Sequence, residues 1–296
     1  MSGGIETYRG TVYRWEVDNV DHFTVAYYFE RFEDATLALV HALGLDPVAL
    51  ADTGRACITL DCHVRYLREL RMGDVLHIRS GVIDVDADSL TIGHQVLDSA
   101  DDALCTSVVQ RICLVEPPMR AALTLAPAER KAADSLRVEW IAALEPIAAP
   151  AAAATSDRFR ETARDTIKLW EVDMLGQAAF PAYVHRFSAA NGHLLADFGM
   201  SPAYMKSEER GFSTFEFKLR FLGALRAGDL ILVRSALTHV GASSIRILHR
   251  MTNVRSGEEM ATLEQSGVHL DTGARKSIPL PDGLRDRARA LLVSGA

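Results

Sequence analysis

The chain repeats itself once, and this internal repeat constrains its fold more than any other feature of its 296 residues. The tetrapeptide WEVD at residues 15–18 recurs 155 residues later, at 170–173. The same offset holds without a gap over more than a hundred positions, and about a quarter of the aligned residues are identical. Average composition would give on the order of one identity in fifteen by chance. The sequence therefore predicts two copies of one fold.

Each copy passes from a helical to a strand-like hydrophobic period. After a short β-like run (residues 9–17 and 164–172) and a polar loop, apolar residues recur every three or four positions, which predicts a helix buried along one face. They are Tyr28, Phe32, Ala35, Leu39 and Leu43, and then Tyr183, Phe187, Ala190, Leu194 and Phe198. The period then falls to two from residue 58 and from residue 215, which predicts strands with one apolar face. Three more strand-like runs with short connections follow in each copy, near 75–85, 90–98 and 104–115, and near 230–240, 245–254 and 260–270.

The copies set the predicted domain boundaries. We expect an N-terminal unit at 1–116, an Ala/Pro-rich linker with one helix at 117–158, and a C-terminal unit with a terminal helix at 159–296. The linker helix is predicted from Pro127 to Leu144, with Leu136 and Trp140 on its apolar side, and the stretch 148–154 as a flexible joint. One helix against an antiparallel meander gives an α+β class for each unit.

Charge and cysteine content exclude several classes of function. A net charge of −7 provides no broad basic field for nucleic acid or for an anionic membrane surface. No run of 18 apolar residues and no signal-peptide pattern occurs, so a cytoplasmic protein is expected. The four cysteines form no CxxC pair, which argues against disulfides, structural zinc and redox chemistry and favours buried free thiols. We expect neither a metal nor a cofactor.

The polar loop before each helix is the candidate for chemistry. Asp18 and Asp173 stand at its start, where a carboxylate stabilises a helix N-terminus and loop hydrogen bonds without any catalytic role. The alternative is that this carboxylate, a hydrogen-bonding side chain four residues later (His22 or Gln177) and free helix amides converge on one point. Such a set suits acyl transfer, because the carboxylate can activate water or attack directly while the amides stabilise an oxyanion.

The repeated motifs resemble one known family. The spacing W-x-V-D-x-x-G/D-H/Q, an aromatic residue in the following helix, and R-Y/F-L before a G-D turn are similar to the hotdog-fold acyl-CoA thioesterases of the 4-hydroxybenzoyl-CoA thioesterase type. The resemblance covers residues 5–115 and 160–271 and implies a tandem double hotdog, each unit a central helix wrapped by an antiparallel β-sheet, with thioester sites at the interface between units. It also implies that Asp18 and Asp173 are the catalytic carboxylates, and that the backbone amides of Val25 and Phe180 polarise the thioester carbonyl.

Each copy departs from the family pattern at one position. Asp21 stands where the family usually has glycine, and Gln177 replaces the histidine that the first copy keeps as His22. Glutamine can orient a water or a carbonyl but cannot titrate near neutral pH. Asp18 with His22 is therefore the preferred catalytic pair, and Asp173 with Gln177 is the second. The implied reaction hydrolyses an acyl-CoA thioester, or an acyl-carrier-protein thioester, to the free acid, with CoA as part of the substrate.

Other polar residues recur without a clear role. Arg65 and Arg220 could bind a CoA phosphate, or could belong to a solvated strand face paired with acids, as could His63 and Lys218. His94 and His249 are expected to be structural histidines, each satisfied within its strand surroundings, since no ligand cluster lies near them in the sequence.

Two other functions remain open. One is a hotdog hydratase or dehydratase acting on an enoyl-CoA or enoyl-ACP, and the other is a non-catalytic acyl-CoA-binding module. Residues 32–36, 59–67, 261–265 and 269–271 also resemble the betainyl-CoA thioesterases of carnitine breakdown, whose cationic acyl group would need aromatic faces. Trp15, Tyr28 and Trp170 are more simply core aromatics. The expected partners are an acyl-CoA substrate and further copies of the chain, with no nucleic acid and no membrane.

Overall fold

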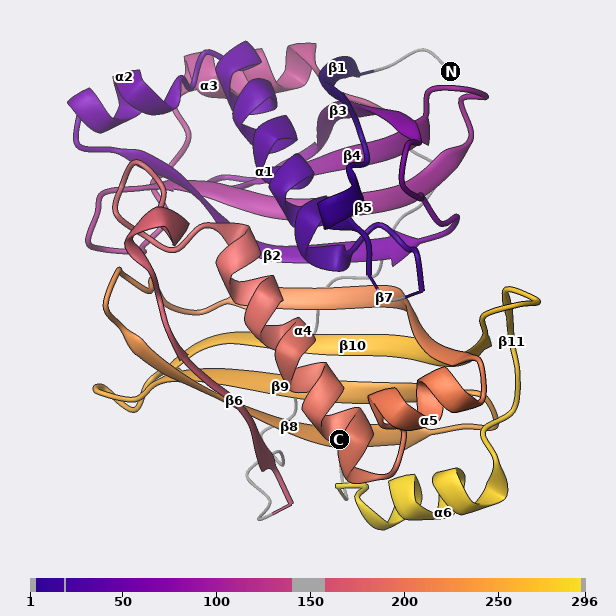
Figure 1. Cartoon of the computed structure of the whole chain (residues 1–296). Coiled ribbons are helices and arrows are strands. Elements are labelled where there is room, and N and C mark those ends of the chain that lie inside the picture. Colours follow the sequence, from indigo (N-terminus) through magenta and orange to yellow (C-terminus); the bar gives the residue numbers. More distant parts are fainter. Residues whose placement is uncertain (1–3, 19, 140–157, 294–296) are drawn as a thin grey trace. The chain divides into compact units, whose positions relative to one another are not determined.

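Both halves of the chain fold into the same arrangement of elements, as the repeat predicts (Figure 1). The computed structural model describes residues 4–18, 20–139 and 158–293, and the chain divides into a first unit, residues 1–147, and a second unit, residues 148–296. The first unit contains β1 (Ile5–Thr11), the 3-10 helix η1 (Arg14–Glu16), α1 (Val25–Ala42), α2 (Pro47–Asp52), β2 (Ala56–Tyr66), β3 (Val75–Val85), β4 (Leu90–Asp98), β5 (Leu104–Val115) and α3 (Pro127–Ser135). The second contains β6 (Arg160–Thr166), η2 (Leu169–Glu171), α4 (Phe180–Asp197), α5 (Pro202–Ser207), β7 (Arg210–Phe221), β8 (Leu230–Val240), β9 (Ser244–Asn253), β10 (Glu259–Asp271), β11 (Lys276–Ser277) and α6 (Asp282–Ala290).

Each unit is one antiparallel sheet covered by one long helix. The strand order is β1-β3-β4-β5-β2 in the first unit and β6-β8-β9-β10-β7 in the second, where β11 also pairs with β10. In Figure 1, α1 and α4 each cross the strands of their own sheet. The predicted α+β class and the predicted antiparallel meanders are confirmed.

The long helices bury the residues that their period predicts. In α1 the side chains of Tyr28, Phe32, Ala35 and Leu39 are at most 3% exposed, and the corresponding residues of α4 are buried as well. Each helix is followed by a glycine with positive φ, Gly44 at 74° and Gly199 at 98°, a backbone conformation that favours glycine after a helix end.

The strands after these helices are interrupted by a bulge that the sequence did not reveal. The register of β2 shifts between Thr59 and Asp61, and that of β7 shifts at the corresponding Phe215. An extra residue reverses which face the following side chains occupy. The predicted unbroken apolar face is therefore wrong, because Phe215 is 41% exposed. His63, for which a solvated strand face was one of two alternatives, is 3% exposed.

The first strand of each unit begins and ends earlier than predicted. β1 and β6 stop at Thr11 and Thr166, and the tryptophans of the WEVD motif lie in the 3-10 helices η1 and η2 instead. Trp15 is 68% exposed and Trp170 is 83% exposed, so the expectation that both are core aromatics is wrong, while it is confirmed for Tyr28.

The helix predicted in the linker packs against the first unit. It ends at Ser135 rather than at Leu144, and Ala133 lies in the core beside the C-terminal part of α1. The chain after it follows β3, where Val82 N–H donates to Leu136 O at 2.9 Å. The predicted terminal helix is present as α6, which ends at Ala290. Trp140 and the alanine-rich joint at 148–154 lie outside the described residues.

A buried histidine lies at the polar centre of each core. His94 Nδ1 is 2.6 Å from Ser80 Oγ, and its Nε2 is 3.1 Å from Thr36 Oγ1, which in turn lies 2.8 Å from Gln110 Oε1. In the second unit, Ser235 Oγ lies 2.6 Å from Nδ1 of the corresponding His249. Burial lowers the pKa of His94 to about 4 and that of His249 to about 3. The prediction of a satisfied structural histidine is confirmed for His94, whereas His249 is buried with a hydrogen-bond partner, among the described residues, at Nδ1 only.

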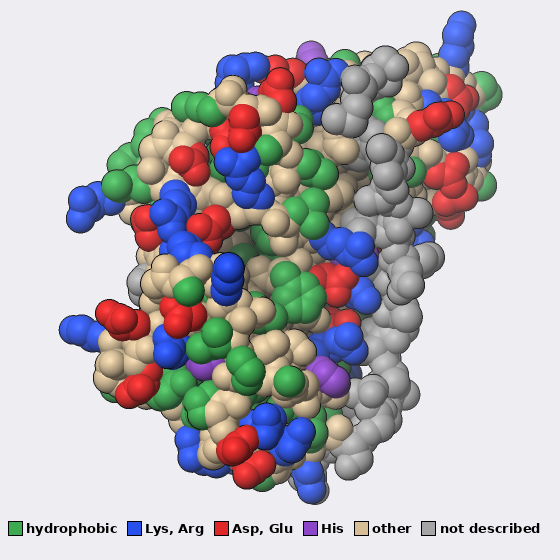
Figure 2. All heavy atoms as spheres, turned by 90° about the vertical axis from the view of Figure 1, so that its right-hand side faces the viewer, with side chains coloured by type: hydrophobic (Ala, Val, Ile, Leu, Met, Phe, Trp, Pro, Cys, Tyr) green, Lys and Arg blue, Asp and Glu red, His purple; other side chains and the backbone are tan. Residues whose placement is uncertain are grey.

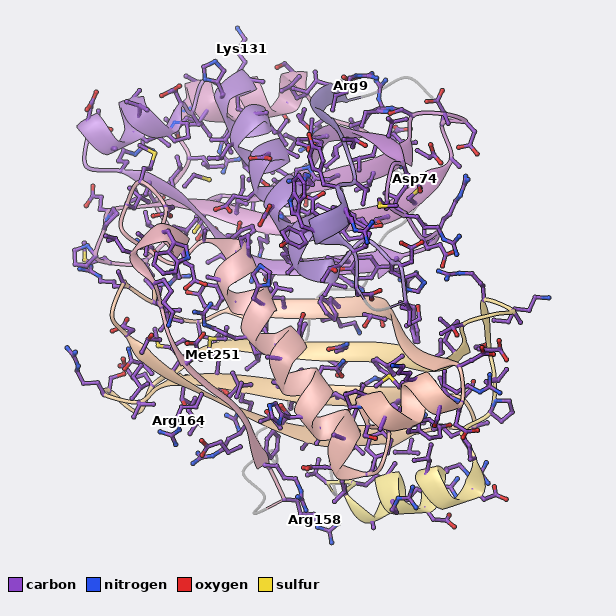
Figure 3. The ribbon with its side chains drawn as sticks, in the orientation of Figure 1. Arg9, Asp74, Lys131, Arg158, Arg164 and Met251 are labelled. Carbon is purple, nitrogen blue, oxygen red and sulfur yellow. The ribbon has the colours of Figure 1, made fainter. Side chains whose placement is uncertain are left out.

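The described surface mixes charges of both signs. On the face shown in Figure 2, Lys and Arg side chains lie among Asp and Glu side chains. The edge strands carry the same ion pair in both units: Arg9 contacts Glu6 and Arg164 contacts Glu161, each at 2.7 Å, and both arginines point outward in Figure 3. Among the helices of the described residues, none is both long and apolar enough to cross a membrane. The cysteines are free thiols, and all but the half-buried Cys57 are buried.

Candidate active site

The loop between η1 and α1 is built around the carboxylate of Asp18. Its Oδ1 accepts hydrogen bonds from the N–H groups of Val20 at 2.9 Å and His22 at 3.0 Å, and Asp18 N–H donates to His22 O at 2.8 Å. Among the described residues, 18 and 20–25, the loop hydrogen bonds to this carboxylate use Oδ1 and none uses Oδ2. Oδ1 therefore stabilises the loop, as the structural interpretation of Asp18 predicts. Oδ2 is left for the chemistry that the catalytic interpretation assigns to the carboxylate.

The corresponding loop before α4 repeats this construction atom for atom. Asp173 Oδ1 accepts from Leu175 N–H at 2.8 Å and from Gln177 N–H at 3.0 Å, and Asp173 N–H donates to Gln177 O at 2.7 Å. Although much of this residue is on the surface, partial desolvation raises the pKa of Asp173, against the lowering effect of these two N–H groups. A raised pKa favours proton acceptance over permanent charge.

The turn geometry explains why glycine is usual at one position of this loop. Gly176 has a φ of 69°, and Asp21, which occupies the same position in the first unit, has a φ of 62°. This left-handed region is easy for glycine and is tolerated by aspartate better than by most residues. The departure at Asp21 is therefore accommodated, because the first unit keeps the same backbone conformation.

The glutamate of the WEVD motif anchors both ends of the loop. In the first unit, Glu16 is 3% exposed, its Oε2 accepts from Tyr13 N–H at 2.8 Å, and its backbone O accepts from Thr24 N–H at 2.8 Å, at the start of α1. Its Oε1 forms an ion pair with the buried Arg31 of α1. The hydrogen bonds tie the residue before the loop to the residue after it.

The second unit has the same anchor in bidentate form. Arg186 donates from Nη1 to Glu171 Oε1 at 2.8 Å and from Nη2 to Glu171 Oε2 at 2.7 Å, while Ala179 N–H donates to Glu171 O at 2.9 Å. Sequence reasoning missed both pairs. The available signal was that glutamate and arginine each recur at the 155-residue offset, the arginine on an otherwise apolar helix face.

The predicted oxyanion amides stand at the helix starts. Val25 is the first residue of α1 and Phe180 is the first residue of α4. The first N–H groups of an α-helix have no partner within the helix and carry its positive dipole end. Within the described loops, neither preceding residue, Thr24 or Ala179, caps its helix through a side chain. These amides are therefore placed to donate to a ligand, and their role stays a prediction.

The G-D motif shapes the turn on which the end of the loop rests. Gly73 has a φ of 89°, and Asp74 Oδ2 accepts from Arg71 N–H at 2.8 Å, in the segment before β3 where Figure 3 labels Asp74. The next contact joins turn to loop: Phe23 N–H donates to Leu70 O at 2.8 Å. The second unit repeats both bonds, Arg226 N–H to Asp229 Oδ2 and Ala178 N–H to Leu225 O, each at 2.8 Å.

The arginines predicted to bind CoA lie at matching strand positions. Arg65 is exposed on β2 opposite Ser107, and Arg220 is half-buried on β7 opposite Thr262. The neighbouring Lys218 lies 3.8 Å from Glu264, as expected for a strand face paired with acids. Phosphate binding by the two arginines stays a prediction.

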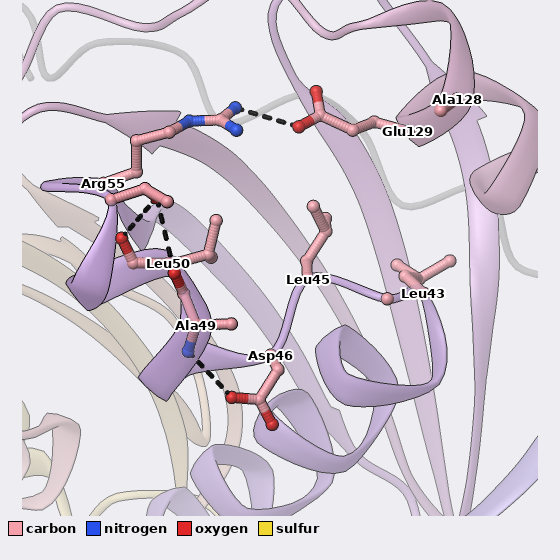
Figure 4. Close-up of a pocket in the computed structure, with 10 residues that line it drawn as sticks. Leu43, Leu45, Asp46, Ala49, Leu50, Arg55, Ala128 and Glu129 are labelled. Atoms are coloured by element: carbon pink, nitrogen blue, oxygen red, sulfur yellow. Dashed lines mark hydrogen bonds and ion pairs between the residues drawn. The ribbon is translucent and has the colours of Figure 1, made fainter.

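A hollow of about 410 Å³ in the first unit lies apart from this loop (Figure 4). It is lined by the end of α1, by α2 and by α3, and the ion pair between Arg55 Nη2 and Glu129 Oε1, 2.9 Å long, borders it. None of the predicted site residues lines it. In the parts of the chain that the structure describes, no three His, Cys, Asp or Glu side chains form a group that could hold a metal ion.

Comparison with known proteins points to one family. Residues 12–132 and 167–288 both match the family described as the thioesterase-like superfamily. The chain is 32% identical to a betainyl-CoA thioesterase of Pseudomonas aeruginosa over 108 residues, which are 36% of this chain and 68% of that protein. It is 29% identical over 110 residues to an L-carnitine dehydrogenase/betainyl-CoA thioesterase of Rhizobium meliloti, of which it spans only 22%.

Solved structures share the fold over both units. An oleoyl thioesterase from Lactobacillus plantarum superposes with a TM-score of 0.73 at 12% identity, covering 94% of this chain and 98% of that one. An acyl-ACP thioesterase from Bacteroides thetaiotaomicron superposes with a TM-score of 0.66 at 12% identity, covering 88% and 96%. The predicted tandem double hotdog is thereby confirmed.

Proposed function

This chain belongs to the thioesterase-like superfamily, and we propose that it hydrolyses an acyl-CoA thioester at the loop that begins with Asp18. The sequence-based resemblance to acyl-CoA thioesterases is confirmed, and so is the expectation of a thioester hydrolase. Which residues act, and on which acyl group, belongs to the proposal.

One observation carries the assignment to this loop. In the part of the loop that the structure describes, Asp18 accepts hydrogen bonds through a single carboxylate oxygen, and it lies shortly before a helix whose first N–H groups have no partner within the helix. A carboxylate with one free oxygen can activate water or attack the thioester carbonyl, and an N–H at a helix start can stabilise the oxyanion that forms. These are the two requirements of thioester hydrolysis, and they are met within eight consecutive residues, 18–25.

In the proposed reaction, the free Oδ2 of Asp18 acts as the base toward water or as the nucleophile. The Val25 amide donates to the thioester oxygen as negative charge develops on it, and His22 orients the water or the thioester. Coenzyme A leaves as the thiol and the acyl group as the free acid. No cofactor takes part in this scheme, since CoA is part of the substrate. Asp173, Gln177 and the Phe180 amide form the second candidate set.

Betainyl-CoA is the first substrate to test, because the Pseudomonas aeruginosa relative, 32% identical over 108 residues, is named for it. We propose free-thiol release as the assay, with a panel of betainyl-, acetyl-, benzoyl- and long-chain acyl-CoA and one acyl-ACP. Thiol release from at least one member is expected. If none is cleaved while CoA binding persists in calorimetry, hydrolysis is refuted and the acyl-CoA-binding alternative is favoured.

The hydratase or dehydratase alternative, the cellular location and the predicted CoA-binding arginines are tested by separate experiments. A hydratase or dehydratase would change the absorbance of an enoyl-CoA without releasing thiol. A cytoplasmic location stays a prediction, which fractionation of cells producing the chain would check. The binding of CoA phosphates by Arg65 and Arg220 predicts a higher KM, at little changed kcat, when either is replaced by alanine.

A further inference from the structure

The hollow in the first unit has a floor of apolar side chains (Figure 4). Leu43, Leu45 and Leu50 line it, and each of them is buried in the core of this unit. Its volume of about 410 Å³ lies within the range of ligand-binding pockets, which is ~300–1,000 Å³. The hollow lies at the end of α1, whereas the loop that begins with Asp18 precedes the start of this helix, about 27 Å away along its axis. The hollow is therefore separate from the proposed reaction site of the same unit.

The second unit carries larger apolar side chains at the corresponding positions. At the 155-residue offset, Leu43 corresponds to Phe198, Ala49 to Tyr204, and Glu129 of α3 to Leu284 of α6. Phe198 and Leu284 are buried together in the core of the second unit, and Tyr204 packs against the same core. The first unit thus has less apolar side-chain volume at matching positions of the repeat, and the hollow occupies the space that is left.

The glycine after each long helix shows the same difference. A β-carbon added to Gly199 would lie 2.6 Å from Nη2 of Arg287, a residue of α6 whose Nε donates to Phe198 O at 2.8 Å. Arg287 corresponds to Ala132 of α3. A β-carbon added to Gly44, which lines the hollow, would meet no described atom within 4 Å. Within the described residues, the end of α4 is therefore covered by α6, while the end of α1 is open.

The polar side of the hollow offers hydrogen-bond donors. Arg55 Nη2 lies 2.9 Å from Glu129 Oε1 (Figure 4), and within the described residues the hydrogen bonds of this guanidinium reach Glu129 alone. The two carboxylates of the lining are already engaged. Glu129 Oε2 accepts from Ala126 N–H at 2.7 Å, and Asp46 accepts from the first N–H groups of α2 and pairs with His41. Arg55 therefore has N–H groups left for a ligand, whereas the acids add negative charge and no donor.

We propose that the hollow is a binding site for an uncharged amphiphile, a linear apolar chain with one terminal hydroxyl or carbonyl oxygen. The chain lies against the three leucines, and the oxygen accepts a hydrogen bond from the guanidinium of Arg55. A carboxylate head group is disfavoured, because the two acids of the lining outnumber its one cation. An ammonium head group is disfavoured, because both acids already have donors and Arg55 repels it. The site does not depend on the proposed thioesterase function.

The first test is isothermal titration calorimetry of the full chain with 1-hexanol and 1-octanol. Each buried methylene contributes a factor of about four in affinity, so octanol should bind ~10- to 20-fold more tightly than hexanol. Octanoate and octylammonium, which carry charged head groups on the same chain, should bind at least ~10-fold more weakly than octanol. No octanol binding, equal affinity for both alcohols, or tighter binding of either charged probe would overturn the proposal.

The polar contact is tested with Arg55→Lys. Lysine keeps a cation beside Glu129 but lacks the remaining N–H groups of the planar guanidinium. The affinity for octanol should fall ~3- to 10-fold, while the midpoint of urea unfolding stays close to that of the wild type. An unchanged affinity would overturn the assignment of Arg55 as the donor.

Two matched substitutions on α2 locate the bound chain. Ala49→Phe places a ring in the hollow, as Tyr204 does at the matching position of the second unit. Phenylalanine is chosen because His269, the partner of the Tyr204 hydroxyl, corresponds to Leu114 in the first unit. The control is Val48→Phe, since Val48 is 60% exposed and does not line the hollow. Ala49→Phe should weaken octanol binding at least ~10-fold and Val48→Phe less than about twofold. Equal effects of the two changes would show that octanol binds elsewhere and would overturn the proposal.

Discussion

Removal of Arg186 is expected to destabilise the second unit strongly. This guanidinium is 4% exposed and donates to both oxygens of Glu171, to Thr166 O at 2.8 Å and to Ala182 O at 2.6 Å. Methionine keeps most of the side-chain volume but leaves the Glu171 carboxylate, whose side chain is 19% exposed, without its cation. Breaking a buried pair in this way typically costs ~3–5 kcal/mol, because a buried charge loses its partner.

The effect of Arg186→Met on stability should depend on pH, because Arg186 shifts the pKa of Glu171. Burial acts to raise the pKa of Glu171, but the hydrogen bonds from Arg186 and from Lys168 N–H, with the charge of Arg186, bring it below the ordinary value of 4.5. The stabilisation that ionised Glu171 contributes to the folded state is therefore complete above pH 4.5 and is lost as the pH falls through the pKa of Glu171 in the folded state. In Arg186→Met, protonation of Glu171 removes the buried charge, so the difference in free energy of unfolding between the variant and the wild type should become smaller below pH 4.5.

Urea unfolding followed by circular dichroism at pH 7 and pH 4 measures both effects. Arg164→Met, which breaks an exposed pair of the same unit, is the control and should change stability far less. The double variant Glu171→Gln/Arg186→Met should be more stable at pH 7 than Arg186→Met alone. The reasoning would be refuted if Arg186→Met lowered the free energy of unfolding at pH 7 by less than about 1 kcal/mol. It would also be refuted if the difference in free energy of unfolding between Arg186→Met and the wild type were the same at pH 7 and pH 4.

Three further outcomes follow from the geometry. Since burial lowers the pKa of His94 to about 4 and that of His249 to about 3, the unfolded chain binds more protons than the folded chain below pH 6.5, and the free energy of unfolding should fall from there toward pH 4. The contribution of His94 to this fall, about 3 kcal/mol, should be absent in His94→Gln. A free energy of unfolding that does not change with pH in the wild type would contradict this prediction. Gly176→Ala, at a φ of 69°, should cost about 1–2 kcal/mol in urea unfolding, whereas an unchanged midpoint would argue against the left-handed turn. Light scattering should give a mass above the 32.4 kDa of one chain, and a mass of one chain would exclude self-association.

The repeat and the hydrophobic periods predict most of the fold. A helix with one buried face and strands with short connections have patterns that local physics imposes, and α1 and α4 match them closely. The bulges at residues 60 and 215 have no such signal, because one extra residue changes the phase of the strand but not its composition. The prediction that Trp15 and Trp170 are buried in the core was wrong because it used only their size and apolarity. Both lie in 3-10 helices that expose their side chains.

The site is predictable only where it is local in the sequence. The loop hydrogen bonds of Asp18 and Asp173 fall within five consecutive residues, so the spacing of the motif points to them. The ion pair between His22 Nε2 and Glu69 Oε2, 2.8 Å long, is different, because it depends on how the turn before β3 packs against the loop.

The comparison of Asp18→Asn with Asp173→Asn tests the central claim most directly. Both changes keep a side-chain oxygen that can accept the loop N–H groups and remove only the carboxylate charge. Initial rates of CoA release, with the best substrate of the panel, should be almost abolished by Asp18→Asn and largely retained in Asp173→Asn. Hydrolysis that survives Asp18→Asn and is lost in Asp173→Asn would place the reaction in the second unit and contradict the account.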